Sequence, residues 1–224
     1  MSKPKAWVCW SCGKDSAWAL HVVRQQNEVD VVGLLTVITE TYGRTAMHAV
    51  REDVLVAQAK ALGLPVCRVP IPSPCSNEVY RQAMRRAVDQ ARDAGVRHMI
   101  FGDLYLQDVR SYREESLQGT GIAPLFPLWM RPTRALAGEM IDGGLVAYVT
   151  SLDPRKMPRE FAGSVFNAEF LRRLPAGVDP CAENGEFHTC VTAGPMFVHP
   201  LNVTVGQTLE RECFVFTDLV LVKE

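Results

Sequence analysis

In the first half of the chain, short continuous apolar runs alternate with longer stretches in which apolar residues recur every three or four positions. The apolar runs predict buried strands over residues 6–10, 31–38, 66–71 and 98–101. The amphipathic stretches predict helices that begin near Asp15, Val50 and Val79, and Gly63 and Gly95 end the second and the third. This alternation with short connections predicts an α/β fold with a doubly wound parallel sheet. In such sheets ligands lie beyond the carboxyl ends of the strands.

The second half of the chain is interrupted differently, because Pro124, Pro127 and Pro132 break it repeatedly. We place a domain boundary near Pro127, with an N-terminal domain of residues 1–127 and a smaller C-terminal α+β domain of residues 128–224. A charged helix and a short strand, over 108–117 and 122–126, precede the boundary. Beyond it we expect helices over 134–140 and 161–174, and strands over 145–150, 201–205 and 213–222.

The composition narrows the class of protein without pointing to a partner. The 24 basic and 25 acidic residues nearly balance, which disfavours an electrostatic nucleic-acid binder and a membrane-surface protein. No apolar run is long enough to span a bilayer, and the N-terminus has no signal-peptide core. The 7 cysteines have no disulfide-framework spacing, so we expect reduced thiols and a cytoplasmic protein. The sequence leaves open whether the protein forms a homodimer.

Residues 11–16, with the sequence SCGKDS, link the first strand to the first helix. We expect a tight turn there, with Asp15 and Ser16 as helix caps. Such a strand–turn–helix unit aims backbone N–H groups and the positive end of a helix dipole at one point, where a phosphate would bind. Lys14 adds a charge, and Ser11 and Ser16 add hydroxyl donors. The spacing does not fit the Walker A pattern, and an ordinary polar turn is the alternative interpretation.

Two further loops end at the same edge of the predicted sheet, over residues 39–44 and 102–103. Asp103 follows a strand directly and is well placed for Mg²⁺ or a ribose hydroxyl, and Arg110 is a candidate clamp for phosphate or carboxylate. Thr36, near the end of the second strand, is a candidate nucleotide contact. The simpler interpretation of the segment after residue 103 is that Asp108 caps a salt-bridged surface helix.

Residues 179–190, with the sequence DPCAENGEFHTC, gather polar side chains that no apolar periodicity places in a core. Such a loop can bind a cationic substrate or ammonium, hold a metal or move protons. A hairpin turn centred on Asn184 and Gly185 is the structural alternative. Zinc is disfavoured, because His188 with Cys181 and Cys190 lacks a standard ligand spacing.

These segments together resemble, in their order along the chain, the diphthine–ammonia ligase family. Residues 11–16 are similar to the SGGKDS loop of the PP-loop ATP pyrophosphatases, with Cys12 in place of the first Gly. Residues 123–129 contain a segment like APLW, and residues 183–189, ENGEFHT, resemble an EGGEYET loop, with Asn184 for Gly and His188 for Glu. The resemblance spans nearly the whole chain and implies an adenine nucleotide alpha hydrolase-like fold for the N-terminal part.

The family's reaction implies ATP and Mg²⁺ as cofactors. A carboxylate is adenylated with release of pyrophosphate, and ammonia then displaces AMP to give an amide. The implied acceptor is a small or protein-borne carboxylate, in this family diphthine on elongation factor 2, and the second substrate is ammonium.

We assign site residues on the positions that match. Those assigned to ATP are Ser11, Cys12, Gly13, Lys14, Asp15, Ser16, Thr36 and Asp103. Among them, the candidate catalytic residues are Lys14, Asp15 and Ser16, and Asp15 is the candidate Mg²⁺ ligand. The candidate substrate-binding residues are Arg110, Glu183, Asn184, Gly185, Glu186, His188 and Thr189.

Two other function classes stay open. One is a PP-loop sulfur transferase acting on tRNA, for which Cys181 and Cys190 flank the acidic loop, although buried thiols are the commoner explanation. The other is a non-catalytic module that binds ATP or AMP. Among the histidines, His21 and His48 are interpreted as surface or satisfied helical residues rather than ligands.

Overall fold

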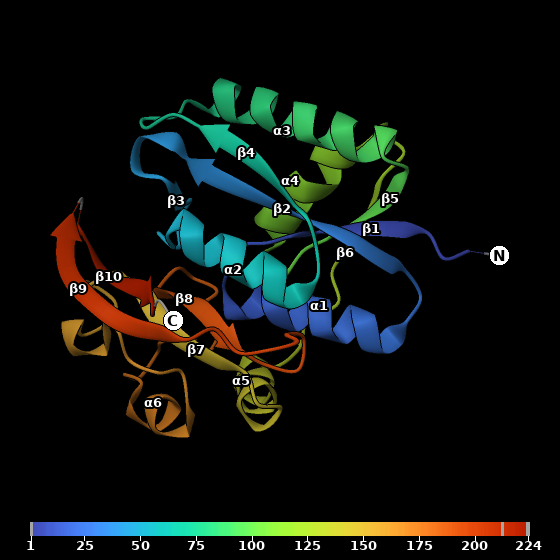
Figure 1. Ribbon diagram of the computed structural model, residues 1–224. Coiled ribbons are helices and arrows are strands. Elements are labelled where there is room, and N and C mark those ends of the chain that lie inside the picture. The colour runs from blue at the N-terminus through green and yellow to red at the C-terminus, as the bar shows by residue number, and fades with distance from the viewer. Residues whose placement is uncertain (1, 212, 223–224) are drawn as a thin grey trace.

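The computed structural model describes residues 2–211 and 213–222 and contains two β-sheets (Figure 1). The first sheet confirms the predicted α/β fold, because its main strands run parallel. The parallel strands are β1 (Lys5–Cys9), β2 (Asp30–Thr39), β4 (Val66–Ile71), β5 (Val96–Ile100) and β6 (Ala123–Leu125). A short strand, β3 (Arg44–Thr45), pairs antiparallel with β2.

The strand order of this sheet creates a switch point beside β1. β1 pairs with β2 on one side, β2 pairs with β4, and the chain then crosses to β5 and β6 on the other side of β1. β1 and β5 are neighbours, and the loops that follow them turn away from each other at the carboxyl ends of the strands. In a doubly wound sheet a crevice forms between two such loops.

Helices cover both faces of this sheet (Figure 1). α3 (Asn77–Asp93) and α4 (Gln107–Leu117) lie on one face, where Ala87, Ala91 and Leu117 join a buried cluster. On the other face lie α1 (Lys14–Gln26), α2 (Glu52–Leu62) and, after β2, the short 3-10 turn η1 (Glu40–Tyr42). The apolar side chains of α1 and α2 belong to a larger cluster that continues into the second half of the chain. α1 and α2 are thus packed between the two sheets.

Two predicted helix caps are wrong. α1 begins at Lys14 with the extended Gly13 as its N-cap, so Asp15 and Ser16 lie inside its first turn. The hydroxyl of Ser16 donates back to the Gly13 carbonyl at 3.0 Å, as serines inside helices often do. α4 likewise begins at Gln107 after Leu106, so Asp108 is not its cap.

The second sheet is antiparallel, with the strand order β8–β7–β10–β9. Its strands are β7 (Val146–Leu152), β8 (Phe187–Ala193), β9 (Val203–Arg211) and β10 (Phe214–Leu221). α5 (Thr133–Asp142), η2 (Arg159–Phe161) and α6 (Ala168–Arg173) accompany it. No helix among the described residues has the length and apolar character needed to cross a bilayer.

Two expectations for this half of the chain fail. The helix expected over 161–174 is reduced to α6, because Gly163 has a φ of +76° and Val165 bridges to Tyr148. Asn167 then caps α6 by accepting from the Phe170 N–H at 2.8 Å. Residues 187–193 form strand β8 and not a loop, and the hairpin centred on residues 184–185 is absent, since β8 pairs with β7. Nearly all of β8 is buried on both faces, so it shows no alternation.

The free edge of β8 lies against the turn between β1 and α1. Val191 N–H donates to the Cys12 carbonyl at 2.9 Å. The side chain of Gln58, fully buried on α2, joins the same junction: its amide donates to the Val191 carbonyl at 2.7 Å and to the Cys12 carbonyl at 3.2 Å. Its oxygen accepts from the Trp10 indole at 2.9 Å. One amide therefore connects α2, the end of β1 and the second sheet.

We expect Gln58→Met to lower the free energy of unfolding by about 1–3 kcal/mol, because the buried Trp10 N–H loses its acceptor while the volume stays similar. Urea-induced unfolding measures the change. Gln25→Met is the matched control, since Gln25 is exposed on α1, and it should change the value by less than about 0.5 kcal/mol. Equal stability of Gln58→Met and wild type would show that this junction does not depend on Gln58.

Candidate active site

A cavity of about 590 Å³ lies beyond the carboxyl ends of β1, β2 and β5. It brings together most of the residues singled out in the sequence, from both halves of the chain. Those that line it are Ser11, Lys14, Asp15, Ser16, Thr36, Asp103, Glu183, Gly185, His188 and Thr189. The other five do not line it: Cys12, Gly13, Arg110, Asn184 and Glu186.

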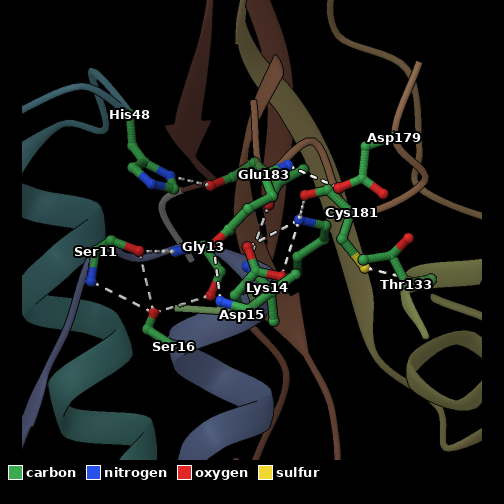
Figure 2. A network of polar contacts seen from close by, with 12 residues as sticks. Ser11, Gly13, Lys14, Asp15, Ser16, His48, Thr133, Asp179, Cys181 and Glu183 are labelled. Atoms are coloured by element: carbon green, nitrogen blue, oxygen red, sulfur yellow. Dashed lines mark hydrogen bonds and ion pairs between the residues drawn. The ribbon is translucent and has the colours of Figure 1, made fainter. Parts of the chain in front are cut away.

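The turn at the start of α1 is closed by its own hydroxyl groups (Figure 2). The Ser11 and Ser16 hydroxyls are 3.2 Å apart, and the Ser16 oxygen also accepts from the Ser11 N–H at 3.3 Å. Gly13 N–H donates to the Ser11 hydroxyl at 3.3 Å. These bonds hold the N-terminal turn of α1 against the cavity, where its N–H groups and dipole favour an anion.

Cys12 and Gly13 shape this turn from outside the cavity. Cys12 takes the left-handed conformation, with a φ of +71°, although it is not glycine, and its side chain is fully buried. At Gly13 a Cβ atom would lie 2.9 Å from His48 Nδ1 and 3.2 Å from the Thr189 carbonyl oxygen. Glycine is therefore required at position 13 by the close approach of these two groups.

Lys14 is a buried cation with well-defined partners. Its ammonium lies 2.8 and 3.0 Å from the two Asp15 carboxylate oxygens and donates to the Cys181 carbonyl. It also lies over the Phe187 ring, 5.6 Å from its centroid. Burial is the largest single influence and lowers the pKa of Lys14, but Asp15, Cys181 and Asp179 together outweigh it, and the net pKa is raised. Lys14 therefore stays charged at the base of the cavity (Figure 2).

Asp15, the candidate Mg²⁺ ligand, directs both carboxylate oxygens at the Lys14 ammonium. Its side chain is 25% exposed and lines the cavity beside the N-terminal turn of α1. Within residues 2–211 and 213–222 no group of three or more His, Cys, Asp and Glu side chains is arranged to hold a metal. A single carboxylate suits Mg²⁺, which usually binds one or two carboxylates together with substrate phosphates and water.

The residues after β5 divide into two groups. Asp103 lines the cavity and pairs with Arg113 at 3.4 Å. Arg110 lies outside it: its guanidinium pairs with Glu114 at 2.8 Å and lies over the Trp129 ring, 4.7 Å from its centroid. This is the surface arrangement that the simpler interpretation of the segment predicts.

Thr36 lines the cavity, but its hydroxyl donates to the Trp10 carbonyl at 2.9 Å. The residues near it form an apolar wall from β2, β4, α3 and the start of α4. This wall contains Leu35, Val37, Ile71, Met84, Leu106 and Val109, with Tyr80 beside them. Apolar side chains therefore line part of the cavity, with the Arg113–Asp103 ion pair next to Tyr80.

The two glutamates of the acidic segment differ in their surroundings. Glu183 lines the cavity, and one of its oxygens accepts from the Leu104 and Tyr105 N–H groups at 2.7 and 3.3 Å. Burial raises its pKa to about 7. Glu186 is 4% exposed and accepts from the Asp179 N–H and the Asn184 amide, both at 3.2 Å. Glu183 is thus placed for proton transfer, and Glu186 holds the segment in shape.

His48 lines the cavity, so its interpretation as a surface or helical residue is wrong. It precedes α2, and its Nδ1 lies 2.8 Å from the Thr189 carbonyl oxygen. Its ring centroid lies 4.7 Å from that of His188. Burial lowers the pKa of His48 to about 4 and that of His188 to about 3. The only signal in the sequence is that His48 follows the polar loop at the edge of the sheet.

The thiols near the cavity favour the protonated form; Cys181 and Cys190 are buried and Cys9 is partly buried. Burial raises the pKa of Cys9, Cys181 and Cys190 to about 12 in each case. A nucleophilic sulfur must be a thiolate, so these thiols are poorly suited to sulfur transfer.

Comparison with known families gives two matches that together cover most of the chain. Residues 4–124 match the diphthamide synthase N-terminal domain, and residues 132–223 match the diphthamide synthase C-terminal domain. Comparison with curated proteins gives no match.

We expect Gly13→Ala to weaken ATP binding at least about tenfold, because the new methyl group would displace His48 or β8 from the turn. Calorimetric titration with ATP measures the change. Gly138→Ala is the matched control: its Cβ meets nothing within 4 Å, and it lies inside α5. It should leave affinity unchanged and raise stability by about 0.5–1 kcal/mol. Wild-type affinity in Gly13→Ala would contradict the requirement for glycine.

Proposed function

This chain belongs to the diphthamide synthase family, and we propose that it uses ATP to convert a carboxylate into an amide with ammonia. The family match supports an ATP-using ligase of the PP-loop ATP pyrophosphatase type. The observation that carries the finer proposal is the single cavity that joins the turn at residues 11–16 to the acidic segment at residues 183–189. ATP and the acceptor would meet there.

We assign the polyphosphate to the part of the cavity that the turn at residues 11–16 borders. The N-terminal turn of α1, the Lys14 ammonium and the hydroxyls of Ser11 and Ser16 are the donors that support this placement. Asp15 would hold Mg²⁺, which supplies further positive charge next to the phosphates. The apolar wall around Leu35 and Ile71 suits the adenosine, because a flat base gains most from desolvation against apolar side chains.

The proposed reaction has two steps. A carboxylate oxygen of the acceptor attacks the α-phosphorus, the bond to the β-phosphate oxygen breaks, and pyrophosphate leaves. Ammonia then attacks the acyl carbon, the bond from that carbon to the phosphate oxygen breaks, AMP leaves, and the attached nitrogen releases one proton to solvent to give the neutral amide. The obstacle in the first step is the repulsion between a carboxylate and a polyphosphate. Lys14 and the fixed N–H groups would offset it by positioning and electrostatic stabilisation.

The acceptor is proposed to lie along the acidic segment of residues 183–189. In this division residues 1–127 bind the nucleotide and residues 128–224 supply the acceptor side, with diphthine as the acceptor that the family name suggests. Ammonia attacks only as the free base, so ammonium must lose a proton. Glu183 suits this role, because it borders the cavity and its pKa is raised to about 7 by burial.

The products of ATP turnover test the proposal. With Mg²⁺, ammonium and a panel of carboxylates, AMP and pyrophosphate should form in equal amounts, and the true acceptor should raise the rate. Formation of ADP and phosphate would contradict the adenylating reaction. Tight ATP binding without any product would instead support a non-catalytic binding module.

In the same assay Lys14→Met should lower kcat at least about 100-fold, because the variant lacks the charge that offsets the repulsion. Its thermal unfolding is measured in parallel, since Met keeps the buried stem of the side chain. Lys60→Met is the matched control, because Lys60 is exposed on α2, and it should retain wild-type turnover. Full turnover in well-folded Lys14→Met would refute the assignment.

Glu183→Gln should slow the ammonia-dependent step only where the wild-type residue is ionised. The ratio of wild-type to variant rate should be near one well below pH 7 and rise through about pH 7 to at least about tenfold. Because ammonium ionises to the same extent in both assays, its effect on the rate cancels in this ratio. The raised pKa also means that the stability contributed by this group falls as pH rises from about 4.5 to about 7.

Glu186→Gln is the control within the same segment. Glu186 is buried and does not line the cavity, so this variant should show the wild-type pH dependence of the rate. The protein should become less stable, because the substitution disturbs the buried hydrogen bonds of Glu186. A ratio for Glu183→Gln that does not change with pH would exclude Glu183 as the base.

A further inference from the structure

Two imidazole rings meet over the phosphate-binding turn, and they come from distant parts of the chain. His48 lies between β3 and α2, and His188 lies in β8. Their ring centroids are 4.7 Å apart, and both rings line the cavity together with Ser11 and Lys14. His48 also packs directly on Gly13, the N-cap of α1. The pair therefore borders the position at which the helix terminus favours an anion.

The hydrogen bond of His48 determines its tautomer. A backbone carbonyl can only accept, so Nδ1 of His48 carries the proton that is donated to Thr189 (Figure 2). In the neutral ring Nε2 is then the basic nitrogen. Protonation of Nε2 would leave the bond to Thr189 intact, so this ring can gain a charge without losing its place.

Burial and the charges around the pair explain why both rings are neutral in the free protein. Burial desolvates each ring and is the main cause of its lowered pKa, and the charge of Lys14, from α1, is a smaller cause acting in the same direction on both. The acidic groups that line the cavity with them are Asp15 from α1, Glu183 before β8 and Asp103 after β5. The other titratable groups that line the cavity are Arg113 of α4, Tyr80 of α3 and the thiols of Cys9 and Cys181.

We propose that His48 and His188 form a phosphate-binding imidazole pair that takes up one proton when a polyphosphate occupies the turn at residues 11–16. This inference rests on the proposed function, because it uses the same nucleotide site. A bound polyphosphate brings several negative charges next to the rings, and these would stabilise a protonated ring against the cost of its burial. The proton comes from solvent and adds to one ring nitrogen, and no other bond changes.

Only one ring of the pair is expected to become charged. Two imidazolium groups at a centroid distance of 4.7 Å would repel each other, so the first proton suppresses the second. The resulting cation would bind phosphate by a charge-assisted hydrogen bond. Binding of the polyphosphate should therefore be linked to pH through the pair and not only through Lys14.

Nitrogen NMR of the histidine side chains tests this directly on the full chain, which has five histidines. His48→Gln and His188→Gln assign the two signals, and His199→Gln, at an exposed position, is the matched control. In the free protein both rings should stay neutral from pH 8 down to about 5.5, with His48 as the Nδ1–H tautomer. With saturating inorganic pyrophosphate or ATP, one ring should become imidazolium with an apparent pKa raised by at least about two units.

Calorimetric titration with the same two probes separates the possible failures. In buffers of different ionisation enthalpy near pH 6, wild type and His199→Gln should take up about one proton more than the double variant His48→Gln/His188→Gln does, because either ring alone could still accept the proton. Protons that the probe itself gains or loses on binding are common to all the proteins, so they cancel in this difference. If neither probe binds, the proposed function fails, and this inference fails with it. If a probe binds while both rings stay neutral down to pH 6, the inference alone is overturned.

Discussion

The backbone contact between the edge of β8 and the turn before α1 is the constraint on which the site depends. An edge strand normally presents unpaired N–H and C=O groups to solvent. Here the Val191 N–H donates to the Cys12 carbonyl, and the Thr189 hydroxyl accepts from the Lys14 N–H at 3.1 Å. Because the second sheet is joined to the turn itself, the acidic segment that leads into β8 is carried to the same cavity. A shift of β8 along this edge would separate the two chemical halves of the site.

The site combines groups of opposite character at short range, and burial decides what each can do. Lys14 keeps its charge because Asp15 and a carbonyl oxygen replace the water it loses. Glu183 accepts from two backbone N–H groups, and burial raises its pKa to about 7. Glu186, three residues later, instead accepts hydrogen bonds from its own segment. Neighbouring carboxylates in one motif thus have different tasks, which their residue type alone does not reveal.

The sequence predicts the parallel strands of the first sheet and also β7 and β10 of the second, but it misses β8, for physical reasons. In β1, for example, residues 6–9 form an uninterrupted apolar run that leads to a polar turn, so the local pattern is sufficient. β8 is buried on both faces yet contains His188 and Thr189, so it resembles a polar loop. The helix expected over 161–174 fails where Gly163 takes a positive φ. The grouping of Lys14 and Asp103 follows from the carboxyl-end rule, but His48 and Gln58 depend on partners more than 130 residues away.

Cys12 has a consequence for the entropy of binding. A glycine at this position would move freely between left- and right-handed backbone states, whereas a cysteine with a φ of +71° is held there against a strain of about 1–2 kcal/mol. The surrounding structure, above all the bond from Val191, maintains that conformation. The turn is therefore already ordered before any ligand arrives, and little conformational freedom remains to be lost on binding. The rigidity of a loop usually built from glycine is here supplied by a buried thiol and the strand that packs against it.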